Sequence, residues 1–229
     1  AALLLDDGEV FFGYGIGSNG TTFGEICFNT AITGYQEVLT DPSYAGQIIT
    51  FTFPHIGNVG TNDEDIESLV PSVRGLIVRE AITSPSNFRS NNTLSTWLED
   101  KNITGISGID TRALTRHIRL KGAQNVAIIY PPSREVADLA ALKTQLSAVP
   151  SLKGLELAAE ASCKTPYAWN QPRWALERGY GTLEKPEFHV VAIDYGEKLN
   201  ILRCLASIGC KITVVPAATT ANDILALKP

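Results

Sequence analysis

Toward its carboxyl end, the chain carries two continuously apolar segments separated by a helix-forming segment. Residues 189–194 and 211–215 are apolar along nearly their whole length instead of alternating, which is typical of strands covered on both faces of a parallel sheet. Between them, residues 198–208 place leucines on one helical face. We therefore predict a βαβ unit. Because two parallel strands cannot bury themselves, we expect this unit to open a larger domain of which the chain contains only the beginning.

The first 130 residues show a different pattern, in which short β-branched and aromatic segments alternate with turns and helices. Asp6-Asp7-Gly8 predicts a hairpin turn, since Asp-Gly supplies the positive φ angles that such turns need. Asn92 and Asp110 are the predicted N-caps of two helices, and Gly122 is the predicted end of the second. Strands are predicted at 3–5, 10–12, 25–29, 47–53, 75–80 and 126–130.

Residues 131–187 connect these two regions. An apolar spacing that includes Val136 and Leu146 predicts a helix that ends before Pro150. The remainder is rich in proline, tryptophan and tyrosine, and we interpret it as an irregular linker that packs on a neighbour through its aromatic rings. The prediction is an α/β protein with a mixed β/α domain at 1–130, a helix and linker at 131–187, and the start of a parallel-sheet domain at 188–229.

Composition excludes several classes of protein. Apolar residues make up 44% and charged residues 19%, an ordinary globular mixture. Nineteen Lys and Arg against 24 Asp and Glu give a net charge of −5, which argues against nucleic acid or an anionic membrane as partner. No apolar run reaches the ~20 residues that span a bilayer, and residues 1–5 lack the basic residues of a signal peptide. Four scattered cysteines suggest no disulfide framework, so we expect a reducing, cytoplasmic setting.

A glycine-rich segment at residues 15–20 matches the pattern G-x-G-x-x-G after a predicted strand. A dinucleotide site needs the last glycine to open a helix, whose N-terminal amides bind the pyrophosphate. Here the following residues lead into the strand predicted at 25–29. The sequence therefore favours a plain glycine-rich turn, with a nucleotide-binding α/β protein as the alternative.

Neither the cysteines nor the histidines form a catalytic or metal-binding pattern. The cysteines lie in four different settings: Cys27 within a strand, Cys163 in the linker, Cys204 within a helix and Cys210 after the glycine that ends that helix. At such positions cysteine is typically a small buried apolar residue. The histidines lie in separate elements without metal-ligand spacing; they are His55, His117 and His189. We therefore predict no catalytic residue and no metal ligand among them.

Two further features are ambiguous on local grounds. Arg112, Arg116 and Arg119 lie at positions i, i+4 and i+7, so they predict a basic stripe along the second helix. Such a stripe is either a solvated face paired with surface acids or a partner surface. Ser43, in the loop 41–46, is by itself only a turn serine.

Several longer motifs resemble the small, glutamine-handling subunit of carbamoyl-phosphate synthase. They are Gly24–Glu37, continuing through Leu39–Tyr44, then Pro54–Asn58, Gly108–Arg116, Asn200–Arg203 and Val214–Ala217. The resemblance runs from about residue 3 to the end and weakens only between 131 and 187. The bacterial stand-alone subunit looks closer than the fused animal enzymes.

The resemblance implies an N-terminal domain of mixed β and α structure, followed by a class I glutamine amidotransferase domain that hydrolyses glutamine through a Cys-His-Glu triad. The ammonia would pass to a large synthetase subunit, the expected partner in a heterodimer. That subunit makes carbamoyl phosphate from bicarbonate and ATP for pyrimidine and arginine synthesis. ATP and magnesium are expected on the large subunit, and no cofactor is expected in this chain.

Carried over residue by residue, the resemblance indicates one site residue. Ser43 matches a residue that the family's N-terminal domain contributes to the glutamine pocket. The triad would lie beyond Pro229, so we expect the 229-residue chain to be inactive by itself. Glu197 and Leu199 stand where the family usually has a small or apolar residue and a basic one. The alternative is a non-catalytic module that docks on the large subunit, for which Arg112 and its stripe offer a surface.

Overall fold

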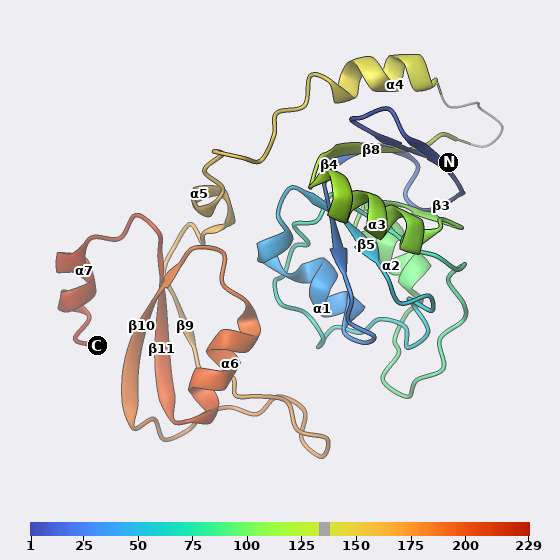
Figure 1. The fold of residues 1–229 in the computed structure, drawn as a ribbon. Helices are drawn as coiled ribbons and strands as arrows, with labels where there is room; N and C mark the ends of the chain where they lie inside the picture. The colour runs from blue at the N-terminus through green and yellow to red at the C-terminus, as the bar shows by residue number, and fades with distance from the viewer. Residues whose placement is uncertain (133–137) are drawn as a thin grey trace. The chain divides into compact units, whose positions relative to one another are not determined.

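The chain folds into two compact units, Ala1–Leu155 and Glu156–Pro229 (Figure 1). This computed structural model describes residues 1–132 and 138–229, so Val136 of the predicted helix lies outside the described residues. Both units combine helices with a sheet that contains parallel strands, which confirms the predicted α/β class. The segment 131–187 contributes to both units, since α4 (Leu139–Leu146) belongs to the first and β9 (Tyr167–Trp169) to the second.

Among the described residues, eight strands form the sheet of the first unit in the order β2-β1-β8-β4-β5-β6-β7-β3. The strands β4 to β7 run parallel to one another, and the remaining pairs are antiparallel. The bounds are β1 (Ala2–Leu5), β2 (Val10–Phe12), β3 (Tyr14–Gly17), β4 (Gly20–Asn29), β5 (Gln47–Phe51), β6 (Gly75–Ile77), β7 (Thr104–Ser107) and β8 (Asn125–Tyr130). The predicted hairpin is confirmed: β1 and β2 pair across a turn in which Gly8 has a φ of 92°.

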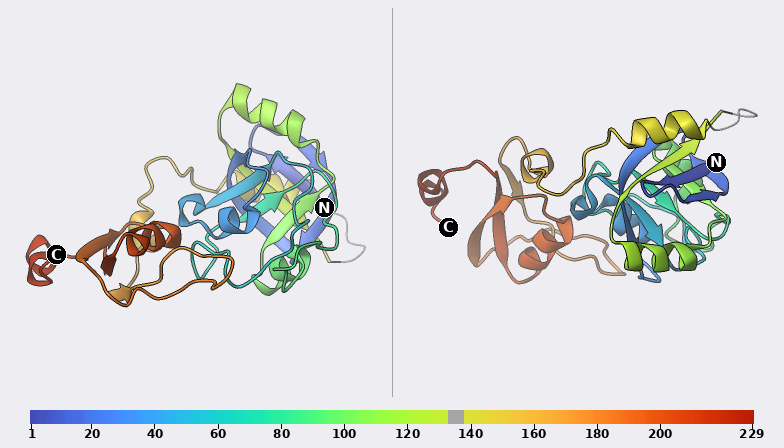
Figure 2. Two further views of the ribbon diagram at one scale, coloured as in Figure 1. Left: turned by 90° about the horizontal axis from the view of Figure 1, so that it is seen from below. Right: turned by 45° about the horizontal axis from the view of Figure 1, so that its top comes forward.

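Helices cover both faces of this sheet, which gives the first unit three layers. Ile48 and Ile49 are neighbours on β5 and point to opposite faces. Ile48 packs with the core side of α3 (Thr111–Lys121), whereas Ile49 packs with residues of α1 (Tyr35–Thr40) and α2 (Leu94–Asp100). Figure 2 shows α3 and α4 on opposite sides of the strands. The hydrophobic core therefore consists of two layers of side chains, one on each face of the sheet, where the apolar stripe of each helix packs against the strands.

The helix caps agree with the sequence at one position and differ at another. Asp110 caps α3 as predicted, because its carboxylate accepts the amide N–H groups of Arg112 and Ala113 at 3.2 and 3.1 Å. The prediction of Asn92 as cap of α2 is wrong by one residue. The hydroxyl of Thr93 accepts the N–H of Thr96, and Asn92 instead accepts the N–H of Thr93. Both are good capping residues, so only the backbone geometry decides between them.

The glycine-rich segment is a strand and a turn, and β4 follows it directly. Glycine is needed at position 15 for packing, since a Cβ there would lie 2.2 Å from Cδ2 of the Tyr130 ring on β8. Gly17 has a φ of 68°, and a Cβ there would lie 2.2 Å from the carbonyl oxygen of Ile103. The dinucleotide alternative needs a helix after Gly20, and the structure has a strand there.

The second unit is built around the predicted βαβ unit, which is confirmed. β10 (Phe188–Asp194) and β11 (Cys210–Pro216) are parallel, and α6 (Leu199–Ser207) connects them and packs on one face.

The linker differs from the irregular segment predicted: β9 pairs antiparallel with β11, and α5 (Ala158–Ala161) precedes it. Trp169 joins the core beside Leu202. A last helix, α7 (Ala221–Ala226), begins after Thr220. Within the residues described, no helix combines the length and the hydropathy needed to cross a membrane.

Candidate functional site

Ser43 lies at the tip of a short 3-10 turn, Pro42–Tyr44, between α1 and β5. The carboxylate of the buried Asp41 accepts the Ser43 N–H at 2.9 Å and so begins the turn. On the other side, the Tyr44 hydroxyl accepts a hydrogen bond from the Asn29 amide at 3.0 Å. The backbone of Ser43 is thus held by a buried acid and by a neighbour tied to β4.

The side chain of Ser43 is exposed and its hydroxyl makes no hydrogen bond with any residue in the described part of the chain. A free hydroxyl can both donate and accept, which suits a ligand with an amide and charged ends. The Ser43 hydroxyl therefore has neither a base nor an acid as hydrogen-bond partner among the described residues, and the Asp41 carboxylate accepts the backbone N–H of Ser43, not its hydroxyl.

Three of the four cysteines are buried or half-buried as predicted, whereas the prediction of a buried position is wrong for Cys204. Burial, followed by the neighbouring Glu25, raises the pKa of the Cys27 thiol to about 12. Burial, followed by Asp194, also raises the pKa of Cys163. Cys210 is buried and Cys204 is exposed on α6, and all four are free thiols. A nucleophilic cysteine needs a lowered pKa and a nearby base, so neither Cys27 nor Cys163 fits that role.

The histidines make separate contacts. His117 Nε2 on α3 lies 2.7 Å from Oδ2 of Asp7, which is in the turn of the β1–β2 hairpin, and His189 Nε2 lies 2.9 Å from the Thr213 hydroxyl. His55 stacks edge-on against Phe53. No histidine is hydrogen-bonded to a cysteine, and no group of three or more His, Cys, Asp or Glu is placed to hold a metal ion, among the residues that the structure describes.

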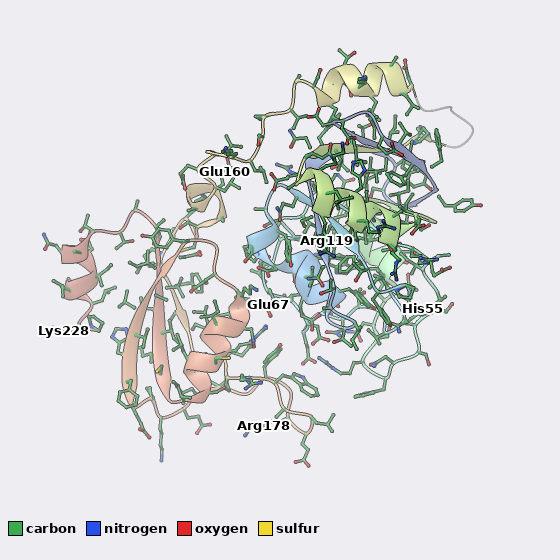
Figure 3. The ribbon with its side chains drawn as sticks, in the orientation of Figure 1. His55, Glu67, Arg119, Glu160, Arg178 and Lys228 are labelled. Carbon is green, nitrogen blue, oxygen red and sulfur yellow. The ribbon has the colours of Figure 1, made fainter. Side chains whose placement is uncertain are left out.

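The basic stripe lines one wall of a pocket of ≈ 630 Å³. Arg112, Arg116 and Arg119 contribute from α3, and Arg79 faces them from the segment after β6. Arg119 is labelled on α3 in Figure 3. Arg79 lies 3.5 Å from Glu80 and 3.8 Å from Asp110, but the three stripe arginines have no carboxylate within 4.0 Å among the described residues. The three arginines are exposed, as a solvated face requires, but the predicted pairing with surface acids is not found among the described residues.

In the second unit, two acidic side chains lie at and just after the carboxyl end of β10, the end of a strand where α/β domains commonly bind ligands. The buried Asp194 carboxylate accepts N–H groups of Cys163, Gly196 and Glu197 at 2.6, 2.8 and 3.0 Å. Beside it, Glu197 Oε1 is buried without a hydrogen-bond partner among the described residues. Burial, followed by the charge of Asp194, raises the pKa of Glu197 to about 7. Glu197 was noted in the sequence only as a departure from the family pattern.

Comparison with known proteins decides the family. A family model described as "Carbamoyl-phosphate synthase small chain, CPSase domain" matches residues 3–128, more than half of the chain. The chain belongs to the carbamoyl-phosphate synthase small-chain family. The match covers the whole eight-stranded sheet of the first unit apart from its outermost residues, so the family shares the fold that carries Ser43 and the arginine pocket.

Curated small-chain relatives extend the likeness to the second unit. The carbamoyl phosphate synthase small chain of Bradyrhizobium diazoefficiens is 54% identical over 233 residues, which covers 100% of this chain and 59% of that protein. The small chain of Rhizobium meliloti is 53% identical and that of Ralstonia nicotianae 52%, and this chain spans 58% and 60% of their lengths. A solved aminopeptidase from Aneurinibacillus sp. strain AM-1 aligns over 98% of this chain and 54% of its own at a TM-score of 0.33 and 10% identity, a likeness that carries no argument.

Sequence reasoning missed the far wall of the arginine pocket in this small-chain family member. Thr30, Thr52 and Arg79 follow β4, β5 and β6, and they meet only because those strands are parallel neighbours. No local spacing connects positions so far apart in the sequence. The predicted strand ends combined with a parallel order were the only signal that could have placed them together.

Proposed function

We propose that this chain is part of the glutamine-handling small subunit of carbamoyl-phosphate synthase. In this role the subunit hydrolyses glutamine and passes the ammonia to a large subunit, which makes carbamoyl phosphate from bicarbonate and ATP. The product supplies pyrimidine and arginine synthesis in the cytoplasm. ATP and magnesium would bind to the large subunit.

The observation that carries this proposal is the family match over residues 3–128, together with 54% identity along the whole chain to a curated small chain. This chain spans about three fifths of the length of those relatives. The proposed activity is therefore that of the longer subunit, in which this chain supplies the first domain and the first βαβ unit of the second.

Ser43 is the residue that we assign to glutamine. Its backbone is fixed by the Asp41 cap and its hydroxyl is exposed without an internal partner among the described residues. A hydroxyl held in this way can bond to the amide or a charged end of glutamine without first breaking another bond. It would contribute to binding and not to the chemical step.

A chimaera tests the proposed function. This chain would replace the aligned part of the Bradyrhizobium diazoefficiens small chain, to which it is 54% identical over its whole length. The chimaera is then mixed with the large subunit of that organism. Carbamoyl phosphate synthesis driven by glutamine is expected. A complex that makes carbamoyl phosphate from added ammonia but not from glutamine would overturn the assignment to glutamine handling.

The alternative is a non-catalytic module that docks on the large subunit. The unpaired arginines of α3 favour it, because arginine is enriched where protein partners bind. It predicts that the 229-residue chain by itself binds the large subunit, and that Ser43→Ala in the chimaera leaves the KM for glutamine unchanged. A raised KM for glutamine in that variant would favour the glutamine-handling function instead.

A further inference from the structure

The arginine pocket lies where parallel sheets typically bind ligands. Thr30 directly follows the last residue of β4, Thr52 directly follows β5, and Arg79 comes two residues after β6. These strands are parallel neighbours, so the three residues are at one edge of the sheet, that of the carboxyl ends. The amino-terminal half of α3 forms the opposite wall through Thr111 and Arg112. Ligands of open α/β sheets commonly bind at this edge.

The charged side chains that line the pocket are all positive. Its lining contains four arginines and four threonines, with no aspartate, glutamate or lysine. The three arginines of α3 lack a carboxylate partner among the described residues, while Arg79 is shared between Glu80 and Asp110 at its margin. Residues 112 to 119 span about 10 Å of helix, at 1.5 Å per residue. In a chain of net charge −5, this is a local concentration of unneutralised positive charge.

A buried hydroxyl without a hydrogen-bond partner among the described residues lies near the carboxyl end of β5. Thr50 has 0% exposure, and its Oγ1 has no hydrogen-bond partner among the described residues. Thr50 lies two residues before the pocket-lining Thr52, so both project from the same face of β5. That face is the one covered by α3, because Ile48 and Ile77 on it pack with Leu114. A buried hydroxyl without a partner is uncommon in a region that serves only as core.

The side chains indicate the chemistry of the ligand. A guanidinium matches the oxygens of phosphate or carboxylate with two parallel hydrogen bonds. A threonine hydroxyl can add a single donor, although that of Thr115 already donates to the Thr111 carbonyl at 2.7 Å. A phosphate group carries about −1.5 to −2 charges near neutral pH, whereas a carboxylate carries one, so phosphate better neutralises a pocket wall that carries several arginines. No aromatic ring lines the pocket for a nucleobase to stack on. The chemistry therefore favours a small phosphate-bearing molecule over a nucleotide recognised by its base.

We propose that the pocket between α3 and the carboxyl ends of β4, β5 and β6 is a binding site for a small phosphate-bearing molecule, with Arg116 and Arg119 as its main ligands. The proposal does not depend on the glutamine-handling function. It assigns a use to the basic stripe that requires no second protein.

Calorimetric titration of the 229-residue chain with inorganic pyrophosphate tests the site. Arg116→Gln is expected to weaken the pyrophosphate Kd by at least about tenfold, the factor that 1.4 kcal/mol of lost binding energy corresponds to. The exposed Arg74 provides a matched control, because it precedes β6 and so lies at the opposite end of that strand from Arg79. Arg74→Gln removes the same charge and is expected to leave the pyrophosphate Kd unchanged. Unchanged thermal unfolding of each variant shows that the fold is intact.

Three results would overturn the site. One is the absence of pyrophosphate binding to the unaltered chain. Another is equal weakening by Arg74→Gln and Arg116→Gln, which would mean attraction to net charge only. The third is binding of a poly-glutamate peptide at the α3 arginines without binding of pyrophosphate or phosphate, which would make this face a surface for an acidic protein segment.

Discussion

Glu197 is held in an environment that favours its neutral form. Burial, followed by the charge of the adjacent Asp194, raises its pKa from the ordinary value of 4.5 to about 7. The adjacent Asp194 carboxylate accepts three backbone N–H groups, which fix its position beside Glu197. At the scale of single residues, the second unit thus contains one carboxyl that titrates near neutrality.

The pH dependence of stability follows with a definite sign. Between pH 4.5 and about 7, folded Glu197 keeps a proton that the unfolded chain has released, so stability falls as the pH rises through this window. Glu197→Gln cannot ionise, and we expect its urea midpoint, followed by circular dichroism, to fall less than that of the unaltered chain between pH 5 and pH 8. An equal fall in both proteins would contradict the raised pKa.

The exposed hydroxyl of Ser43 leads to a prediction about the affinity of the subunit for glutamine. In the chimaeric small subunit, Ser43→Ala should raise KM for glutamine several-fold, since a net hydrogen bond contributes about 0.5–1.5 kcal/mol. The turnover number should change little, because the proposed hydrogen bond to glutamine would be the same in the ground and transition states. Steady-state kinetics at saturating bicarbonate and ATP measure both values. An unchanged KM would remove Ser43 from the site.

Among the elements, α3 packs on the sheet with one face and lines the arginine pocket with another, and the Asp110 cap stabilises its first turn. Asp110 accepts the N–H groups of Arg112 and Ala113, which α3 cannot satisfy internally. Asp110→Ala should lower the free energy of unfolding by about 0.5–2 kcal/mol, measured by urea denaturation. Asp110→Asn keeps a capping oxygen and should recover most of that loss. If both variants are equally destabilised, the cap is not the cause.

The elements predicted from sequence are those whose pattern is local. The βαβ unit, the first hairpin and the Asp110 cap each depend on residues close together in the chain, and all three are confirmed. The glycine pattern at residues 15–20 favours a turn, yet residues 14–17 form β3, and Gly15 is needed there because the Tyr130 ring of a distant strand packs against it. The pocket failed to appear in the sequence for the same reason, since Thr30, Thr52 and Arg79 meet only in the sheet.

For the whole molecule, the positions of the thiols and imidazoles determine the expected activity. Two of the cysteines have raised pKa values, and none is hydrogen-bonded to a histidine within the described residues. We therefore expect the 229-residue chain to release no ammonia from glutamine above a no-enzyme blank, as measured by a coupled glutamate dehydrogenase assay. Turnover above the blank that disappears in a Cys204→Ser variant would reverse this conclusion, because Cys204 is the exposed thiol.

The pairing of the first strand with the last of its sheet has a consequence for synthesis on the ribosome. β1 lies beside β8, with Ala2 opposite Ile129, and β8 also pairs with β4. The amino-terminal strand leaves the ribosome long before its partner is made. At about 5–20 residues per second the delay is on the order of ten seconds. During that time β1 can pair only with its hairpin partner β2, so the leucines of β1 are not covered by the rest of the sheet until β8 has been made.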